Sequence, residues 1–226
     1  VAEDGRKPIR LIKPGAPLHW KNAVRYNPIG ACNAVMIRRE SIIKAGGLGV
    51  PGARRCEDWD LWLRMIRCGM VFFYLPKLLA YYRQHDAVLT QDPLAMLEEK
   101  IKLLDRLCSN DPRLEKAVPM GQPTLGESEY SEIRNGFIFY ALGSGVGQHM
   151  PVDKMDGILR LFHYKTYDYR ACCNAFLYGM QHSLQIHPSP NFISGSYMID
   201  VLDRIEYRLF LHGYNGYSRA ITLKEL

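Results

Sequence analysis

The segment between Asp58 and Gly69 constrains the fold most, because its apolar residues have the spacing of one buried helical face. Four residues recur at positions i, i+3, i+4 and i+7: Trp59, Trp62, Leu63 and Ile66. Asp58 is suited to cap the amino end, and Gly69 can end the helix in the left-handed conformation. We therefore predict a helix between Asp58 and Gly69, with both tryptophans packed in the core.

Short apolar runs around this helix have the length of β-strands. Residues 34–37 lie between polar neighbours, Val71–Leu75 is closed by a proline, and Leu78–Tyr82 follows it. Residues 39–44 can form a short helix that Gly46 and Gly47 would end. This mixture predicts an α/β arrangement for the first part of the chain.

The composition changes near residue 90, and the remainder reads as helical. Asp92 and Pro93 have the residue types of an N-cap and a first helical position. The buried stripe of this helix is predicted as Leu94, Leu97, Ile101, Leu104 and Cys108. Further helices are expected over roughly 128–149, 153–182 and 195–212. We therefore divide the chain into residues 1–90, mixed α/β, and residues 91–226, a helical region.

Charge and cysteine content exclude several classes of protein. Lys and Arg number 29 against 23 Asp and Glu, a net charge of +6, but the basic residues are scattered and form no basic–aromatic nucleic-acid motif. We therefore expect no nucleic-acid partner. The six cysteines have neither zinc-site nor disulfide-framework spacing, which favours reduced thiols in the cytoplasm. Residues 70–82 are too short an apolar run to span a bilayer.

The adjacent carboxylates Glu57 and Asp58 are the best candidates for chemistry. At a helix start, the free N–H groups and the helix dipole favour an ionised carboxylate, which can accept a proton from a sugar hydroxyl as a general base. The alternative is that Asp58 only caps the helix. On spacing alone, that alternative is the stronger one.

Four ordered elements resemble family 2 glycosyltransferases. They are Asn27–Arg39, an apolar run ending in Arg-Arg; the Gly-Gly turn in Ala45–Leu48; the acidic stretch Glu57–Arg64; and Tyr81–His85, which has the form Tyr-Arg-x-His. The resemblance covers about residues 25–90. It implies the acceptor-side half of a GT-A type (nucleotide-diphospho-sugar transferase) domain, followed by the helical region.

The resemblance also implies roles for individual residues. Asp58 would be the catalytic base of an inverting transfer from a nucleotide-diphospho-sugar donor to a glycan or lipid-linked acceptor, with Glu57 helping to orient the acceptor. Arg83 and His85 would lie near the donor diphosphate or its metal ion, His85 as a weak metal ligand candidate; they can equally be an ordinary surface arginine and loop histidine. Arg54, Arg55 and Trp59 are candidates for acceptor or loop contacts.

The donor side of such an enzyme is not evident in the sequence. The expected cofactor is Mg²⁺ or Mn²⁺ held by an Asp-x-Asp pair, but the only such pair, Asp58 and Asp60, follows no apolar strand. Its side chains would also point about 200° apart around a helix. We therefore expect a fragment that lacks the donor-binding half and is inactive alone, with uncovered apolar surface and poor solubility. The alternative is a natural short protein that lost the donor half.

Two readings of the function remain open. In the first, the chain belongs to an enzyme of polysaccharide biosynthesis, cytoplasmic or peripheral at the inner face of the membrane. In the second, it is a non-catalytic, glycosyltransferase-like interaction module, which docks a partner through aromatic-rich stretches such as residues 137–140 and 164–178. The donor sugar, the acceptor, the linkage and the oligomeric state are not specified by the sequence.

Overall fold

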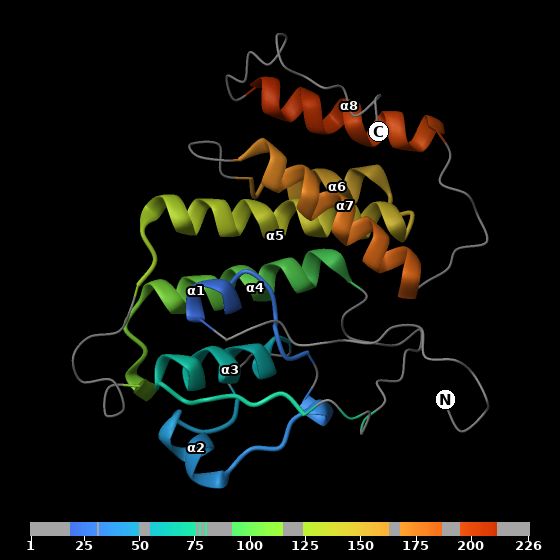
Figure 1. Ribbon diagram of the computed structural model, residues 1–226. Helices are drawn as coiled ribbons and strands as arrows, with labels where there is room; N and C mark the ends of the chain where they lie inside the picture. The colour runs from blue at the N-terminus through green and yellow to red at the C-terminus, as the bar shows by residue number, and fades with distance from the viewer. Residues whose placement is uncertain are drawn as a thin grey trace. The chain divides into compact units, whose positions relative to one another are not determined.

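The described part of the protein is helical throughout. The computed structural model describes residues 19–30, 32–49, 55–75, 77, 80, 92–114, 124–162, 168–186 and 195–211. Within these ranges there are eight α-helices and no β-strand (Figure 1). The α/β fold and its GT-A sheet, predicted from the sequence, are therefore wrong for the residues described. The chain forms two compact units, Val1–Ile133 and Arg134–Leu226.

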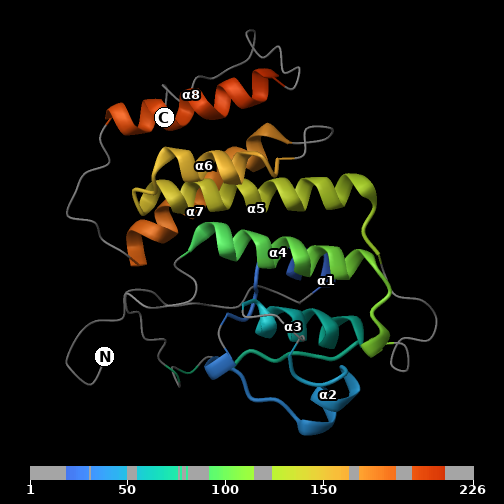
Figure 2. The same ribbon diagram turned by 180° about the vertical axis from the view of Figure 1, so that it is seen from behind.

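Helix α3 (Glu57–Arg67) is the centre of the first unit. It lies between α2 (Arg39–Lys44) and α4 (Pro93–Cys108) in both views, and it also contacts α1 (Trp20–Ala23) (Figures 1 and 2). Eight of its eleven residues are buried, so it is a core helix surrounded on all sides rather than a surface helix with one apolar face. The tryptophans that the sequence assigned to the core are buried there: Trp59 is 3% exposed and Trp62 is 1% exposed.

Glycines end α2 and α3 in the same way. After α3, the N–H of Gly69 bonds the carbonyl of Ile66 and the N–H of Met70 bonds that of Met65, with Gly69 at φ +73°. After α2, the N–H groups of Gly46 and Gly47 bond carbonyls of the last turn in the same pattern. Both are Schellman ends, in which a residue at positive φ satisfies carbonyls left free by the helix. The predicted end of each helix is confirmed.

Gly46 has a second reason to be glycine. A Cβ at this position would lie 2.9 Å from the carbonyl oxygen of Arg113 and still closer to the Cβ of Arg113. Arg113 belongs to the short 3₁₀ helix η3 (Pro112–Leu114), which follows α4. The end of α2 and the segment after α4 therefore pack backbone to backbone at Gly46.

A cluster of charged side chains is buried on the polar side of α3. The Asp60 carboxylate, 3% exposed, accepts hydrogen bonds from Arg64 Nε at 2.8 Å, from Arg113 Nη1 and Nη2 at 3.0 and 3.2 Å, and from Arg106 Nε at 3.4 Å. Arg113 also binds Asp111 at 2.6 Å. We call this set, together with the buried Arg67, the arginine cluster: Arg64, Arg67, Arg106, Arg113, Asp60 and Asp111.

The arginine cluster also holds the end of α2. Arg64 Nη1 donates to the carbonyl of Ala45 and, at 2.9 Å, to that of Gly47. Because Ala45 and Gly47 terminate α2, one side chain of α3 satisfies carbonyl groups that a short helix would otherwise leave buried and unpaired. The polar half of α3 is buried because these partners surround it.

Two extended segments explain why the expected strands are absent. Val35 and Ile37 pack against the core of α3 whereas Met36 is 99% exposed, and Met70 and Phe72 pack inward whereas Phe73 is 91% exposed. This alternation is the side-chain period of a strand. Among the described residues, however, neither segment forms a ladder of backbone hydrogen bonds with a partner, and without a ladder an extended segment is not a β-strand. The expected strand at Leu78–Tyr82 lies outside the described residues, except for Ala80.

The beginnings of α3 and α4 differ in how well the sequence predicted them. Asp92 caps α4 as expected: its Oδ1 accepts from Leu94 N and Ala95 N at 3.1 Å, and Pro93 is the first helical residue. Asp58, by contrast, does not cap α3, which begins one residue earlier with Cys56 as its N-cap. The prediction of Asp58 as N-cap is wrong, because the left-handed backbone of Cys56 already turns the chain into the helix.

The stripe predicted for α4 is right only in part. Leu97 and Leu104 are buried, while Leu94, Ile101 and Cys108 are half-buried. Leu103 and Leu107 complete the buried set. A helix covered by neighbours on more than one side buries residues beyond a single stripe.

The second unit is built on a close crossing of two helices. It contains most of α5 (Glu127–Gly147), with α6 (Val152–Leu159), α7 (Tyr169–Ile186) and α8 (Gly195–Leu211). A Cβ on Gly143 would meet the backbone of Phe176, and a Cβ on Gly179 would meet the backbone of Tyr140. The two glycines therefore let α5 and α7 approach until their backbones touch.

The predicted helix over residues 153–182 is two helices. It is replaced by α6 and α7, which are separated by residues 160–168. The boundary predicted near residue 90 falls among residues that lie outside the described ranges, so it stays a prediction. No helix in the described ranges is both long and apolar enough to cross a bilayer.

We predict that Asp60→Asn destabilises the first unit strongly. The change leaves buried guanidinium groups without their shared carboxylate, and breaking a buried ion pair on one side costs about 3–5 kcal/mol. All three tryptophans lie in residues 20–62, so urea unfolding followed by tryptophan fluorescence reports on this unit. Glu132→Gln, which breaks the exposed contact with Arg25, is the control and should change the midpoint little; equal midpoints for Asp60→Asn and wild type would contradict the prediction.

We also predict that the exposed apolar side chains of the extended segments make the protein self-associate. Large apolar side chains exposed to this degree promote association in water. The double variant Met36→Ser, Phe73→Ser should lower the weight-average mass measured by light scattering at a given concentration. Tyr207→Ser, which changes a side chain 62% exposed in the second unit, should not. A wild-type protein that stays monodisperse as its concentration rises would count against the prediction.

Candidate functional site

The amino end of α3 carries the two carboxylates that the sequence singled out. Cys56 precedes the helix at φ +60° and ψ +15°, a left-handed conformation that is uncommon for a residue other than glycine. Glu57 is exposed and Asp58 is half-buried. The Oδ1 atom of Asp58 accepts a hydrogen bond from the N–H of Trp59 at 2.6 Å. The sequence reasoning therefore placed both side chains correctly at the helix start.

The surroundings of Asp58 favour its protonated form more than water does. Burial raises the pKa of Asp58 above its ordinary value, and the charge of Glu57 adds to the rise; hydrogen bonds from the Trp59 N–H and the Asn27 side chain oppose it. The net shift is upward. A carboxylate with a raised pKa binds a proton more tightly, which makes it a stronger base than an exposed aspartate.

Asn27 was not identified as a site residue from the sequence. Its Oδ1 accepts from the N–H groups of Ile29 and Gly30 at 3.2 and 3.1 Å, and its Nδ2 donates to Gly30 O at 3.2 Å. These bonds fix the loop that brings the amide to Asp58. The Asn-Pro pair at residues 27 and 28 signals a turn. This local signal does not predict the contact between Asn27 and Asp58, which are 31 positions apart.

Two thiols and an amine complete the surroundings of the acidic pair. Cys32 is an exposed residue, but its thiol is partly buried. This partial burial, together with the charges of Asp58 and Glu57, raises the pKa of the thiol. Burial raises the pKa of Cys56 to about 11. Burial likewise lowers the pKa of Lys100, on α4, to about 8, although the charge of Cys56 acts to raise it. The region therefore contains an amine that is more readily deprotonated than an ordinary lysine, and no motif in the sequence indicated it.

Of the other predicted site residues, Trp59 and Arg55 are described by the structure. Trp59 is buried, and its Nε1 donates to Ala23 O at 2.7 Å, so it fastens α3 to the end of α1. Arg55 is half-buried directly before Cys56. Arg54, Arg83 and His85 lie outside the described residues, so their proposed contacts with the acceptor, diphosphate or metal stay predictions, as does an acceptor contact for Trp59.

The side chains of Asp58 and Asp60 do not form a metal-binding pair. Asp58 meets Asn27 and the Trp59 N–H at the start of the helix, whereas Asp60 is bound by three arginines. In the described ranges, no group of three His, Cys, Asp or Glu side chains is arranged to hold a metal ion. These residues therefore do not supply the ligand set for the Mg²⁺ or Mn²⁺ that the family resemblance implies.

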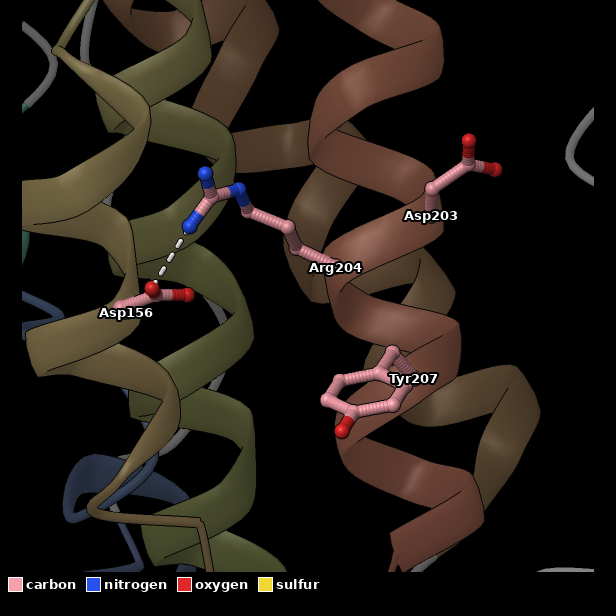
Figure 3. Close-up of a pocket in the computed structure, with 4 residues that line it drawn as sticks. All are labelled: Asp156, Asp203, Arg204 and Tyr207. Atoms are coloured by element: carbon pink, nitrogen blue, oxygen red, sulfur yellow. Dashed lines mark hydrogen bonds and ion pairs between the residues drawn. The ribbon is translucent and has the colours of Figure 1, made fainter.

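A shallow hollow in the second unit is a weaker candidate. It has a volume of about 340 Å³ and is lined by Asp156 of α6 and by Asp203, Arg204 and Tyr207 of α8. Arg204 reaches Asp156 at 2.7 Å, while Asp203 points away from that pair (Figure 3). Because its two carboxylates do not converge and the only basic group lining the hollow is already paired, it has no arrangement for acid–base chemistry.

Comparison of the chain with protein-family models, with curated proteins and with solved structures finds no match. The resemblance to family 2 glycosyltransferases therefore rests on the residues quoted from the sequence. The geometry at the start of α3 is the remaining evidence on function.

We predict that Asp58→Asn makes the Cys32 thiol more reactive. Removing the adjacent negative charge lowers the pKa of Cys32, and alkylation proceeds through the thiolate. At pH 8 the rate of iodoacetamide labelling of the peptide containing Cys32, followed by mass spectrometry, should rise on the order of a few-fold. Glu98→Gln, which removes an exposed charge on α4, should leave the labelling rate of Cys32 unchanged. If Asp58→Asn and wild type are labelled at the same rate, the Asp58 carboxylate does not act on the thiol.

Proposed function

We propose that this chain supplies the acceptor-activating part of an inverting glycosyltransferase, with Asp58 as the general base. The observation that carries the proposal is the half-buried Asp58 carboxylate, whose pKa is raised by burial and by Glu57 at the start of α3. The ordered residues that resemble family 2 glycosyltransferases support it. The resemblance is used here for the chemistry only, since the described residues are helical.

In the proposed reaction, a hydroxyl group of a glycan or lipid-linked acceptor gives its proton to Asp58. The hydroxyl oxygen forms a bond to the anomeric carbon of the nucleotide-sugar while the bond to the nucleoside diphosphate breaks on the opposite face. The electron pair of the broken bond leaves with the diphosphate. The exposed Glu57 carboxylate beside Asp58 is placed to accept a hydrogen bond from another acceptor hydroxyl and so to orient the sugar.

The raised pKa of Asp58 has a consequence for stability as well as for basicity. The folded state holds the proton more tightly than the unfolded state, so ionisation of Asp58 above its folded pKa lowers the free energy of unfolding. Replacing Asp58 by Asn removes this unfavourable ionisation near pH 7. A carboxylate whose ionisation lowers the stability of the fold is typical of a functional site rather than of a structural cap.

The alternative function is a non-catalytic interaction module, and part of the docking face predicted for it is buried. Phe137, Ile138 and Phe139 are buried in the second unit, so they pack a core there. Tyr178 is 49% exposed, and Tyr164 lies outside the described residues. The observation that now favours an interaction role is the exposed Met36 and Phe73 of the first unit.

The setting of the proposed reaction follows from its donor. Nucleotide-sugars and reduced thiols both belong to the cytoplasm, and we propose that transfer takes place there, with a lipid-linked acceptor bringing the protein to the inner face of the membrane. Arg83 and His85 are proposed to lie on the diphosphate side. The proposal includes a divalent metal ion because the resemblance implies one on the diphosphate of the donor. Ligands for this ion are not found among the residues that the structure describes.

We predict that Asp58→Asn abolishes sugar transfer without lowering stability. Transfer is measured in the protein as the cell makes it, by release of nucleoside diphosphate with a panel of donors and acceptors. Loss of a positioned general base should lower the rate by roughly 10²–10⁴-fold, and wild-type activity should fall as the pH drops through the raised pKa of Asp58. The melting temperature of Asp58→Asn should equal or exceed that of wild type.

Matched variants separate the base from its neighbours. Glu57→Gln should retain part of the activity because it keeps a hydrogen-bonding group at the same position, and Glu98→Gln should retain all of it. Undiminished turnover in Asp58→Asn would exclude the assignment, as would a wild-type protein that releases no nucleoside diphosphate from any donor.

A further inference from the structure

Large apolar side chains of the first unit are exposed around α2 and the two extended segments. Within residues 34–49 and 70–77, six of them are at least 56% exposed: Met36, Ile43, Leu48, Val71, Phe73 and Leu75. In the described part of the second unit, the corresponding side chains are Tyr178, Ile199 and Tyr207, which are 49–62% exposed. Single exposed apolar residues are ordinary on a protein surface, but several from neighbouring elements mark a surface that binds something.

These side chains point away from the core of the first unit. The inward residues of both extended segments pack against the same core cluster of α3. Because side chains alternate along an extended backbone, the outward residues, such as Met36 and Phe73, leave the opposite side. Both views show α2 and the two segments beyond α3, on the side away from α4 (Figures 1 and 2). The exposed apolar residues therefore belong to one end of the unit.

The same two ranges are rich in positive charge. They contain one acidic residue, Glu40, and four cations: Arg38, Arg39, Lys44 and Lys77. All four cations are exposed, and in the part of the chain that the structure describes none of them has an ion pair. Arg38 has an extended backbone and follows Met36 by two positions, so the two side chains leave the same side of the segment. Basic and apolar groups are thus adjacent here.

This combination fits the surface of an anionic lipid bilayer. Apolar and aromatic side chains enter the boundary between headgroups and acyl chains, and cations beside them are attracted to anionic headgroups. A second copy of the chain also buries the apolar residues, but a two-fold contact brings the cations of one copy near those of the other, where they repel. A bilayer accepts side chains from separate segments without a matching relief, and its charge is opposite to theirs.

We propose that this basic–apolar face, made by the six apolar and four basic residues named above, docks the first unit on a membrane that contains anionic lipids. Met36 and Phe73, the most exposed of the apolar side chains, enter the headgroup region, and the cations contact the anionic headgroups. The docking agrees with the membrane setting proposed for sugar transfer but does not rest on that reaction. Binding is measured without donor or acceptor, and Asp58→Asn should bind as wild type does.

The proposal is tested by flotation of the full chain with vesicles of phosphatidylcholine, with and without phosphatidylserine. Self-associated protein without lipid stays at the bottom of the gradient and is not counted as bound. Wild type should float with the vesicles that contain phosphatidylserine and not with phosphatidylcholine alone, and added sodium chloride should lower the bound fraction by screening. Absence of flotation with the anionic vesicles would overturn the proposal.

A pair of charge variants tests whether the cations of this face are the ones that bind. Each basic residue at an anionic surface contributes about fivefold to binding, so Arg38→Gln with Arg39→Gln should weaken it on the order of 20-fold. Arg38 makes no side-chain cap bond to α2, so the helix loses no cap. Lys154→Gln with Arg160→Gln removes two exposed charges of the second unit and should bind as wild type does. Equal losses in the two pairs would mean diffuse attraction to a basic protein and would overturn the face.

A pair of apolar variants tests insertion. Met36→Ser with Phe73→Ser should weaken vesicle binding by about tenfold or more, because apolar area no longer leaves water. Ile199→Ser with Tyr207→Ser, exposed in the second unit, should bind as wild type does. Equal midpoints of urea unfolding show that each pair is folded. Vesicle binding that is unchanged in Met36→Ser with Phe73→Ser would overturn the proposal, as would a lower mass of this variant in light scattering without any vesicle binding by wild type, which would assign the face to a second copy.

Discussion

The Asp60 carboxylate is the interaction on which the first unit depends. It joins Arg64 on its own helix to Arg106 on α4 and Arg113 after α4, and Arg64 continues the network to the carbonyls that end α2. A helix as deeply buried as α3 cannot leave its polar face without partners. The network supplies them, and it requires Gly46, because Arg113 occupies the space of any side chain there.

Asp58 and Asp60 lie on the same helix but differ in the partners that surround their carboxylates. Asp60 is buried and accepts hydrogen bonds from three arginines, the kind of partner that a buried carboxylate needs. Asp58 has fewer: one backbone N–H, the amide of Asn27 and an acidic neighbour, which leave its pKa raised. Asp60 therefore belongs to the packing of the first unit, whereas Asp58 is the residue for which we propose proton transfer. The two lie two residues apart on α3, and the rotation of about 200° between them places their side chains in different surroundings.

Local signals in the sequence predicted local structure well. Gly69, Gly46 with Gly47, and Asp92 with Pro93 each mark a helix end where the structure has one, because capping depends on a few neighbouring residues. The apolar run Val71–Leu75 predicted a strand, and this prediction is wrong for the residues described. The side chains of this segment do alternate between packed and exposed, but a strand needs a partner that no local pattern supplies. The α/β fold predicted from such runs is wrong for the same reason.

Contacts between distant residues were not predicted. Arg113 lies 53 positions from Asp60, and Asn27 and Lys100 approach the acidic pair from opposite ends of the first unit's sequence. Each of these residues is unremarkable in its own segment, so only the packed chain assigns it a role. The family resemblance drew attention to Glu57 and Asp58 but gave no information about the arginines that bind Asp60 on the same helix.

The dependence of α3 on Asp60 has a consequence for mutational scanning of this protein. With Asp58 as the proposed base, substitutions at positions 58 and 60 would both score as loss of function in a growth-based screen, for unrelated reasons. Loss of Asp60 would raise the population of unfolded chains, which cellular proteases remove, so its phenotype would be low abundance. A screen that records protein level alongside activity would separate a residue that maintains the scaffold from one that acts on a substrate, although the two lie next but one to each other in the chain.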